Sequence, residues 1–159
     1  MANSDMIRSQ MSYLQDQLSH LDELIARQKR KIADLGESKY VFKKKSQSLG
    51  DAILHRGKAI SRVGDLASRS VSARKYCEHM QSNVYPQSKQ EIFHALDEME
   101  RDLNMECRKA DEELWQLEDE RRALENQLNG LNMDLDAALR DESNRHQDAS
   151  RSNYSGRYY

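Results

Sequence analysis

The chain has 159 residues, of which 37% are hydrophobic and 33% are charged, against about one quarter charged in an ordinary domain. Its one proline and six scattered glycines disfavour a turn-rich β fold, and its two cysteines disfavour a disulfide scaffold. High charge with modest apolar content favours long amphipathic helices, because a narrow apolar stripe is enough to pack them. We therefore predict an all-α fold.

Charge is distributed unevenly along the chain. Residues 27–75 carry fourteen Lys or Arg and four Asp or Glu, a net charge of +10, whereas residues 76–143 carry seven and eighteen, a net charge of −11. Two halves of opposite charge most simply neutralise each other across a fold. A nucleic-acid or membrane patch is the rival interpretation of the basic half, and the neighbouring acidic half counts against it.

The first predicted helix spans about residues 4–35. Apolar residues alternate at steps of four and three, the spacing of a coiled-coil seam, and Gln28 is the one polar member. The apolar members are Ile7, Met11, Leu14, Leu18, Leu21, Ile25, Ile32 and Leu35. Gly36 follows directly and is typical of a helix stop.

After a polar connection over 37–47, a second helix is predicted at about residues 46–80. Its best seam consists mostly of small residues and includes one charge: Leu49, Ala52, Arg56, Ala59, Val63, Leu66, Ser70, Ala73, Cys77 and Met80. Gly50, Gly57 and Gly64 recur every seven residues beside this seam. Small side chains bury little area and glycine weakens a helix, so this should be the least stable element.

A break is predicted over residues 81–87, because Pro86 biases Tyr85 away from helix. Ser88 and Glu91 then form a capping box that opens a third helix over about 88–140. Its seam continues to the end of the helix through leucines at steps of three and four. Residues 1–140 are therefore predicted to form one helical coiled-coil domain, and residues 141–159, which lack an apolar period, a disordered tail.

These elements predict a long antiparallel helical hairpin or a three-helix coiled-coil bundle. If the second and third helices form a hairpin that turns near Val84, Arg56 of the second seam falls opposite Glu112 and Glu113. A buried arginine needs a facing carboxylate, which supports this register. A shift of three or four residues fits nearly as well, so the register stays open.

The third helix is longer than the second, which covers it only to about Arg122. Burying one leucine is worth roughly 1.5–3 kcal/mol, so a row of uncovered leucines predicts a surface for a helical partner. Trp115, beside the seam, is the first candidate anchor of that surface. The predicted partner-binding leucines are Leu124, Leu128, Leu131, Leu135 and Leu139. In the alternative interpretation the first helix covers them in a closed three-helix bundle.

Catalytic and metal-binding motifs do not stand out in the sequence. Cys77 and His79 are two residues apart, a spacing that places them on different helix faces and disfavours a zinc site. Cys77 and Cys107 are most simply two small buried residues. We expect no enzyme activity, no cofactor and no small-molecule substrate. No apolar run approaches the ~20 residues of a membrane helix, and a cytoplasmic protein is expected, or one exported without a cleavable signal peptide.

The succession of a heptad helix, a small-residue helix, a break and a long acidic helix resembles the small helical proteins associated with LXG toxins, in the WXG-like group handled by type VII secretion. The resemblance implies binding to the helical N-terminal domain of a toxin and a contribution to its export signal, an aromatic residue with an acid four residues later. Phe93 and Asp97 match that signal, and their spacing places them on one helix face. The leading hypothesis is a non-enzymatic helical adaptor, and the alternative is a cytoplasmic coiled-coil scaffold that self-associates.

Overall fold

A computed structural model describes the backbone of residues 4–66 and 70–155 and the side chains of residues 4–65 and 70–147. Its elements are α1 (Ser4–Leu66), α2 (Val71–His79), the π-helical turn η2 (Met80–Val84) and α3 (Tyr85–Ser155). The described residues contain no strand, which confirms the all-α prediction. They fall into two compact units: unit 1 combines Met1–Lys29 with Glu112–Tyr159, and unit 2 is Arg30–Asp111.

Each unit is a pair of helical segments that run antiparallel, so the prediction of a three-helix bundle is wrong. Gly36 does not end a helix: α1 continues through it and through residues 37–47. A glycine stops a helix when it adopts a positive φ, and no described glycine does so. The lysines and serines of 37–47 are compatible with helix, and Phe42 supplies a half-buried contact there.

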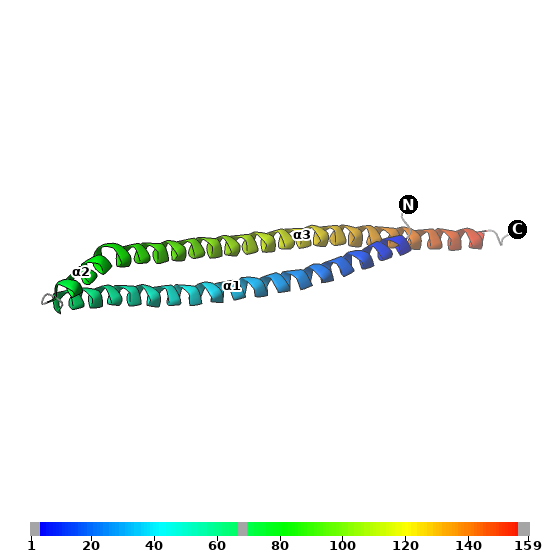
Figure 1. Cartoon of the computed structure of the whole chain (residues 1–159). Helices are drawn as coiled ribbons and strands as arrows, with labels where there is room; N and C mark the ends of the chain where they lie inside the picture. Colours follow the sequence, from blue (N-terminus) through cyan, green and yellow to red (C-terminus); the bar gives the residue numbers. More distant parts are fainter. Residues whose placement is uncertain (1–3, 67–69, 156–159) are drawn as a thin grey trace. The chain divides into compact units, whose positions relative to one another are not determined.

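The predicted break over residues 81–87 is also wrong, because the chain stays helical through it. The backbone N–H of Tyr85 donates to the carbonyl of Met80, five residues earlier, in the π-helical turn η2. Pro86 has no N–H to donate, and a single π turn is a common way for a helix to absorb such an irregularity. In unit 2 the two antiparallel segments are α1 on one side and α2, η2 and the beginning of α3 on the other (Figure 1).

Glycines alternate with the partly buried Ile53 and Ile60 in the seam of unit 2 on the α1 side. Gly50, Gly57 and Gly64 are partly buried, whereas Arg56 and Val63, which were expected in the seam, are exposed. The ring of Phe93 lies over Gly50, where an added Cβ would be 3.7 Å from Cε1. At Gly57 an added Cβ would be 2.5 Å from Cζ of Tyr85, closer than any real contact.

One arrangement occurs twice along this glycine row. The Tyr85 hydroxyl donates to the carbonyl of Ile53 at 2.9 Å and lies over Gly57, four residues later. The Gln81 amide donates to the carbonyl of Ile60 at 3.5 Å and lies over Gly64. Each side chain reaches a helix carbonyl because no Cβ covers the backbone at that point. The glycines thus set the register of unit 2.

This register replaces the predicted one. Tyr85 lies across from Gly57. The adjacent Arg56 is exposed and outside the seam, so it does not need Glu112 as a partner. The charge at position 56 is exposed to water, which removes the cost of burial on which the predicted pairing depended. Nearby, Cys77 is buried beside Gly64, and Cys77 and Cys107 are both free thiols.

Unit 1 has the leucine-rich seam that the first heptads predict. Ile7, Leu21 and Ile25 are buried on the α1 side. Gln28, the polar member of that seam, donates from its side-chain amide to the Glu113 carboxylate at 2.9 Å. On the other side, α3 remains helical to Ser155, which differs from the tail expected from Asp141. Residues 156–159, also part of that predicted tail, lie outside the described residues.

Candidate interaction surface

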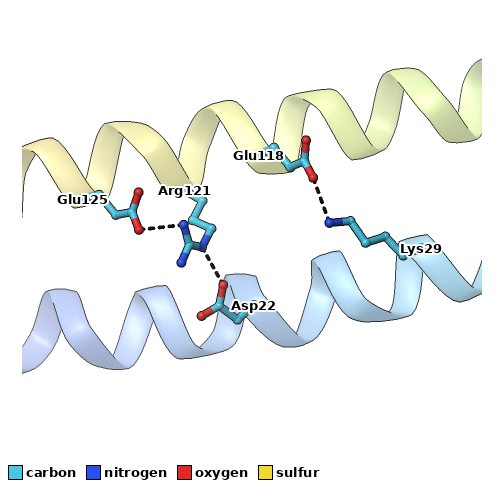
Figure 2. Close-up of polar contacts among 5 residues, drawn as sticks. All are labelled: Asp22, Lys29, Glu118, Arg121 and Glu125. Carbon is cyan, nitrogen blue, oxygen red and sulfur yellow. Dashed lines mark hydrogen bonds and ion pairs between the residues drawn. The ribbon is translucent and has the colours of Figure 1, made fainter.

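The two edges of the unit 1 hairpin differ in chemistry, and one of them is closed by ion pairs. Arg121 bonds to Asp22 across the hairpin at 2.6 Å and to Glu125 on its own helix at 2.6 Å. Lys29 pairs with Glu118 at 3.1 Å (Figure 2). We call this the ion-pair edge. The charged side chains of these pairs span the two helices on this side.

Arg121 occupies a position of the leucine seam and is the centre of this network. Its hydrogen bond to Asp22, together with the charges of Asp22 and Glu125, raises the pKa of the guanidinium further above its ordinary value. An arginine is charged at every physiological pH in any case. The network therefore fixes geometry at the ion-pair edge and does not act as a pH switch.

The opposite edge of unit 1 carries an open groove of about 640 Å³, and we call it the groove edge. Helical spacing places it there, because positions 6, 10 and 13 lie on the other flank of α1 from Asp22 and Lys29. Apolar side chains and a glycine dominate its surface, and polar side chains form its rim. The lining residues are Met6, Ser9, Gln10, Tyr13, Leu14, Gln127, Gly130, Leu131 and Asp134.

The groove edge has two exposed side chains, Met6 and Tyr13, and one position without a side chain, Gly130. Met6 is 54% exposed and Tyr13 is 64% exposed, large fractions for apolar side chains. On the α3 side of the groove lies Gly130, where an added Cβ would meet nothing within 4 Å. Exposed apolar side chains around a concave surface are typical of a binding site, and a third helix is a natural occupant of the groove along two packed helices.

The predicted partner-binding leucines divide between this groove and the seam. Leu131 lines the groove. Leu124, Leu128 and Leu135 are half-buried in the unit 1 hairpin, and Leu139 is 38% exposed. The N-terminal part of α1 thus shelters much of the row that was expected to be uncovered. The leading interpretation, which compared the third helix with the second, overestimated the exposed length, and the alternative, in which the first helix covers these leucines, is closer to the structure.

The remaining predicted partner-binding residue, Trp115, is 64% exposed. It is not among the groove residues, because position 115 lies on the outer face of α3, away from the seam. Conversely, sequence reasoning missed Met6, Tyr13 and Gly130. A signal for the first two was present: they precede the seam residues Ile7 and Leu14 and are seven residues apart, so they form a second apolar row.

The pair with the spacing of an export signal lies in unit 2 and is divided between its interior and its surface. Phe93 packs over Gly50, and the Lys89 ammonium lies 6.0 Å from the centre of its ring. Asp97 is exposed. The aromatic member therefore contributes to the packing of unit 2, and only the carboxylate is fully presented to solvent.

Several exposed cations of the basic half belong to unit 2. Among the described side chains, no carboxylate lies within ion-pair distance of Lys43, Lys45, Arg56, Lys58 or Arg62. The interhelical ion pairs described above belong to unit 1. Lys29 of the basic half does pair with Glu118 of the acidic half, so neutralisation of one half by the other is seen there and not at the five cations named above.

No family model, curated protein or solved structure is significantly similar to this chain. Over residues 4–66 and 70–155, no helix has the length and apolar content needed to cross a membrane. In the same described residues, no three His, Cys, Asp or Glu side chains gather as they would around a metal ion. The groove edge of unit 1 is thus the feature from which a function is best argued.

Proposed function

We propose that this protein is a non-enzymatic helical adaptor that binds a helix of a larger protein along the groove edge of unit 1. The observation that carries the proposal is the juxtaposition of Met6, Tyr13 and Leu131 around the hollow at Gly130. A bound helix would complete a three-helix arrangement and cover the exposed apolar side chains. The resemblance to LXG-associated proteins makes the helical N-terminal domain of a type VII toxin the expected class of partner.

Filling the hollow tests this proposal. A Gly130→Leu substitution adds a side chain to the lining of the groove at a position where the new Cβ would meet nothing within 4 Å. We expect it to weaken binding of a helix by about tenfold, or 1.4 kcal/mol. The probe is a synthetic peptide of about 21 residues, with leucine at the core positions of three heptads and glutamine on the flanks. Fluorescence anisotropy of the labelled peptide measures the affinity.

Gly36→Leu is the matched control. Gly36 is also helical and also open within 4 Å, but it belongs to unit 2 and does not line the groove. Both substitutions should increase helix propensity by a similar amount, so only the location differs. Equal affinities of the two variants and the unmodified chain, or no saturable binding at all, would contradict the proposed function.

The second candidate function is a coiled-coil scaffold that self-associates, and the same exposed apolar groove favours it. Light scattering of the purified chain separates the two candidates. An adaptor should be monomeric when dilute, whereas a scaffold should remain a homodimer or larger assembly.

A further inference from the structure

A polar row, with three carboxylates and one glutamine, runs along the groove edge on α3. Gln127 and Asp134 line the groove, and Glu120 and Asp141 extend the same row in either direction at multiples of seven residues. Seven residues are two turns of a coiled-coil helix, so these side chains share one flank. Glu120, Asp134 and Asp141 are all exposed, and among the described side chains none has an ion-pair partner.

The cations that α1 contributes to unit 1 are already engaged with other carboxylates. Arg8 pairs with Asp5 at 3.7 Å, Arg27 with Glu23 at 3.9 Å, and Lys29 with Glu118 at 3.1 Å. They therefore leave the acidic row without a counter-charge from across the hairpin. An apolar groove beside a row of uncompensated carboxylates is complementary to a helix with an apolar stripe and basic flanks.

We infer that the groove edge selects a basic amphipathic helix of another protein, one with lysine or arginine at heptad spacing beside its apolar stripe. This inference rests on the proposed function and names the chemistry of the partner. A second copy of this chain docked through the same edge would bring two acidic rows together, and like charges at close range disfavour that pairing. Complementary charges would also help to fix the register of the bound helix, since basic residues at heptad spacing would face Glu120, Asp134 and Asp141, with Gln127 at the one uncharged position of the row.

Three peptides with the same leucine stripe test the inference, and they differ only in flanks of lysine, glutamine or glutamate. At about 50 mM salt, where exposed charges are weakly screened, we expect the lysine peptide to bind at least about tenfold more tightly than the glutamate peptide. A lysine-flanked peptide whose leucines are scrambled off one face is the control for simple charge attraction. It should not bind saturably.

Charge reversal at Glu120 and Asp134 tests whether the acidic row causes the preference for the lysine peptide. Glu120→Lys combined with Asp134→Lys should abolish or invert the order of the lysine and glutamate peptides. Glu112→Lys with Asp136→Lys is the matched control: it changes the net charge by the same amount at exposed positions off the groove edge. The control variant should still bind the lysine peptide more tightly than the glutamate peptide, although its affinity for the lysine peptide should be lower than that of the unmodified chain.

The outcomes distinguish this inference from the proposed function. Equal affinities of the three peptides would overturn the basic partner and leave the groove as a helix-binding site. No binding of any peptide would overturn the proposed function itself. Displacement of the lysine peptide by unlabelled chain, with light scattering that shows self-association at low salt, would identify a second copy as the occupant and so overturn the inference.

Discussion

Gly57→Ala should destabilise the protein, although alanine is ordinarily the better helix former. The added methyl group would lie 2.5 Å from Cζ and 2.9 Å from Cε1 of Tyr85, so the ring must move and its hydrogen bond to Ile53 must break. Overpacking of this kind costs about 1–3 kcal/mol, which outweighs the gain of about 1 kcal/mol in helix propensity. Urea unfolding followed by far-UV circular dichroism measures the change.

Two further variants isolate the cause. Gly36→Ala, at an open position of the same helix, should stabilise the protein by about 0.5–1 kcal/mol. Tyr85→Ala should make Gly57→Ala harmless, because it removes the ring that occupies the space. If Gly57→Ala were as stable as Gly36→Ala, the glycine row would not determine the register of unit 2.

Leu128→Asp should unfold unit 1, a second large effect. Leu128 lies half-buried in the leucine-rich seam, and a carboxylate there replaces an apolar contact with a poorly solvated charge. The expected cost is about 3 kcal/mol or more. Hydrogen exchange resolved along the chain should show loss of protection in residues 4–29, which belong to the same unit.

Asn129→Asp is the control for added charge. Asn129 is the next residue along α3 and is exposed, so its change to aspartate should leave stability within about 0.5 kcal/mol. Protection of residues 4–29 that survives Leu128→Asp would mean that the seam leucines are not needed for the hairpin. Those leucines would then be free for a partner, as sequence reasoning expected.

The predictable part of the fold was the part whose seam consists of large apolar residues. Ile7, Leu21 and Ile25 repeat at heptad spacing, and they are buried as the period predicts. In unit 2 the period failed, because three of the partly buried positions of α1 are glycines, which have no side chain and therefore do not appear in an apolar pattern. No local pattern indicates that Tyr85 will lie over Gly57. Pro86, beside Tyr85, led us to predict a break in the helix, whereas the chain forms a π-helical turn just before it.

The sequence predicted an apolar partner-binding surface on the acidic helix, but it did not predict which residues line the groove. An apolar surface on the acidic helix was expected, and Leu131 lies in the groove. The groove itself needs Met6 and Tyr13 from α1, and their contribution depends on which segment of α1 packs beside Leu131. The predicted hairpin paired the third helix with the second and not with the first, so it missed the contribution of α1 to the groove.

Methyl NMR of the methionines tests the central claim most directly. Met6 lines the groove, whereas Met133, Met99 and Met105 are exposed elsewhere, at 74%, 56% and 64%. Addition of the lysine-flanked helix to the chain labelled with ¹³C at the methionine methyl groups should shift the Met6 signal and leave the other three nearly unchanged. An unmoved Met6 signal, with binding established by anisotropy, would contradict the assignment of the groove edge as the surface that receives the helix.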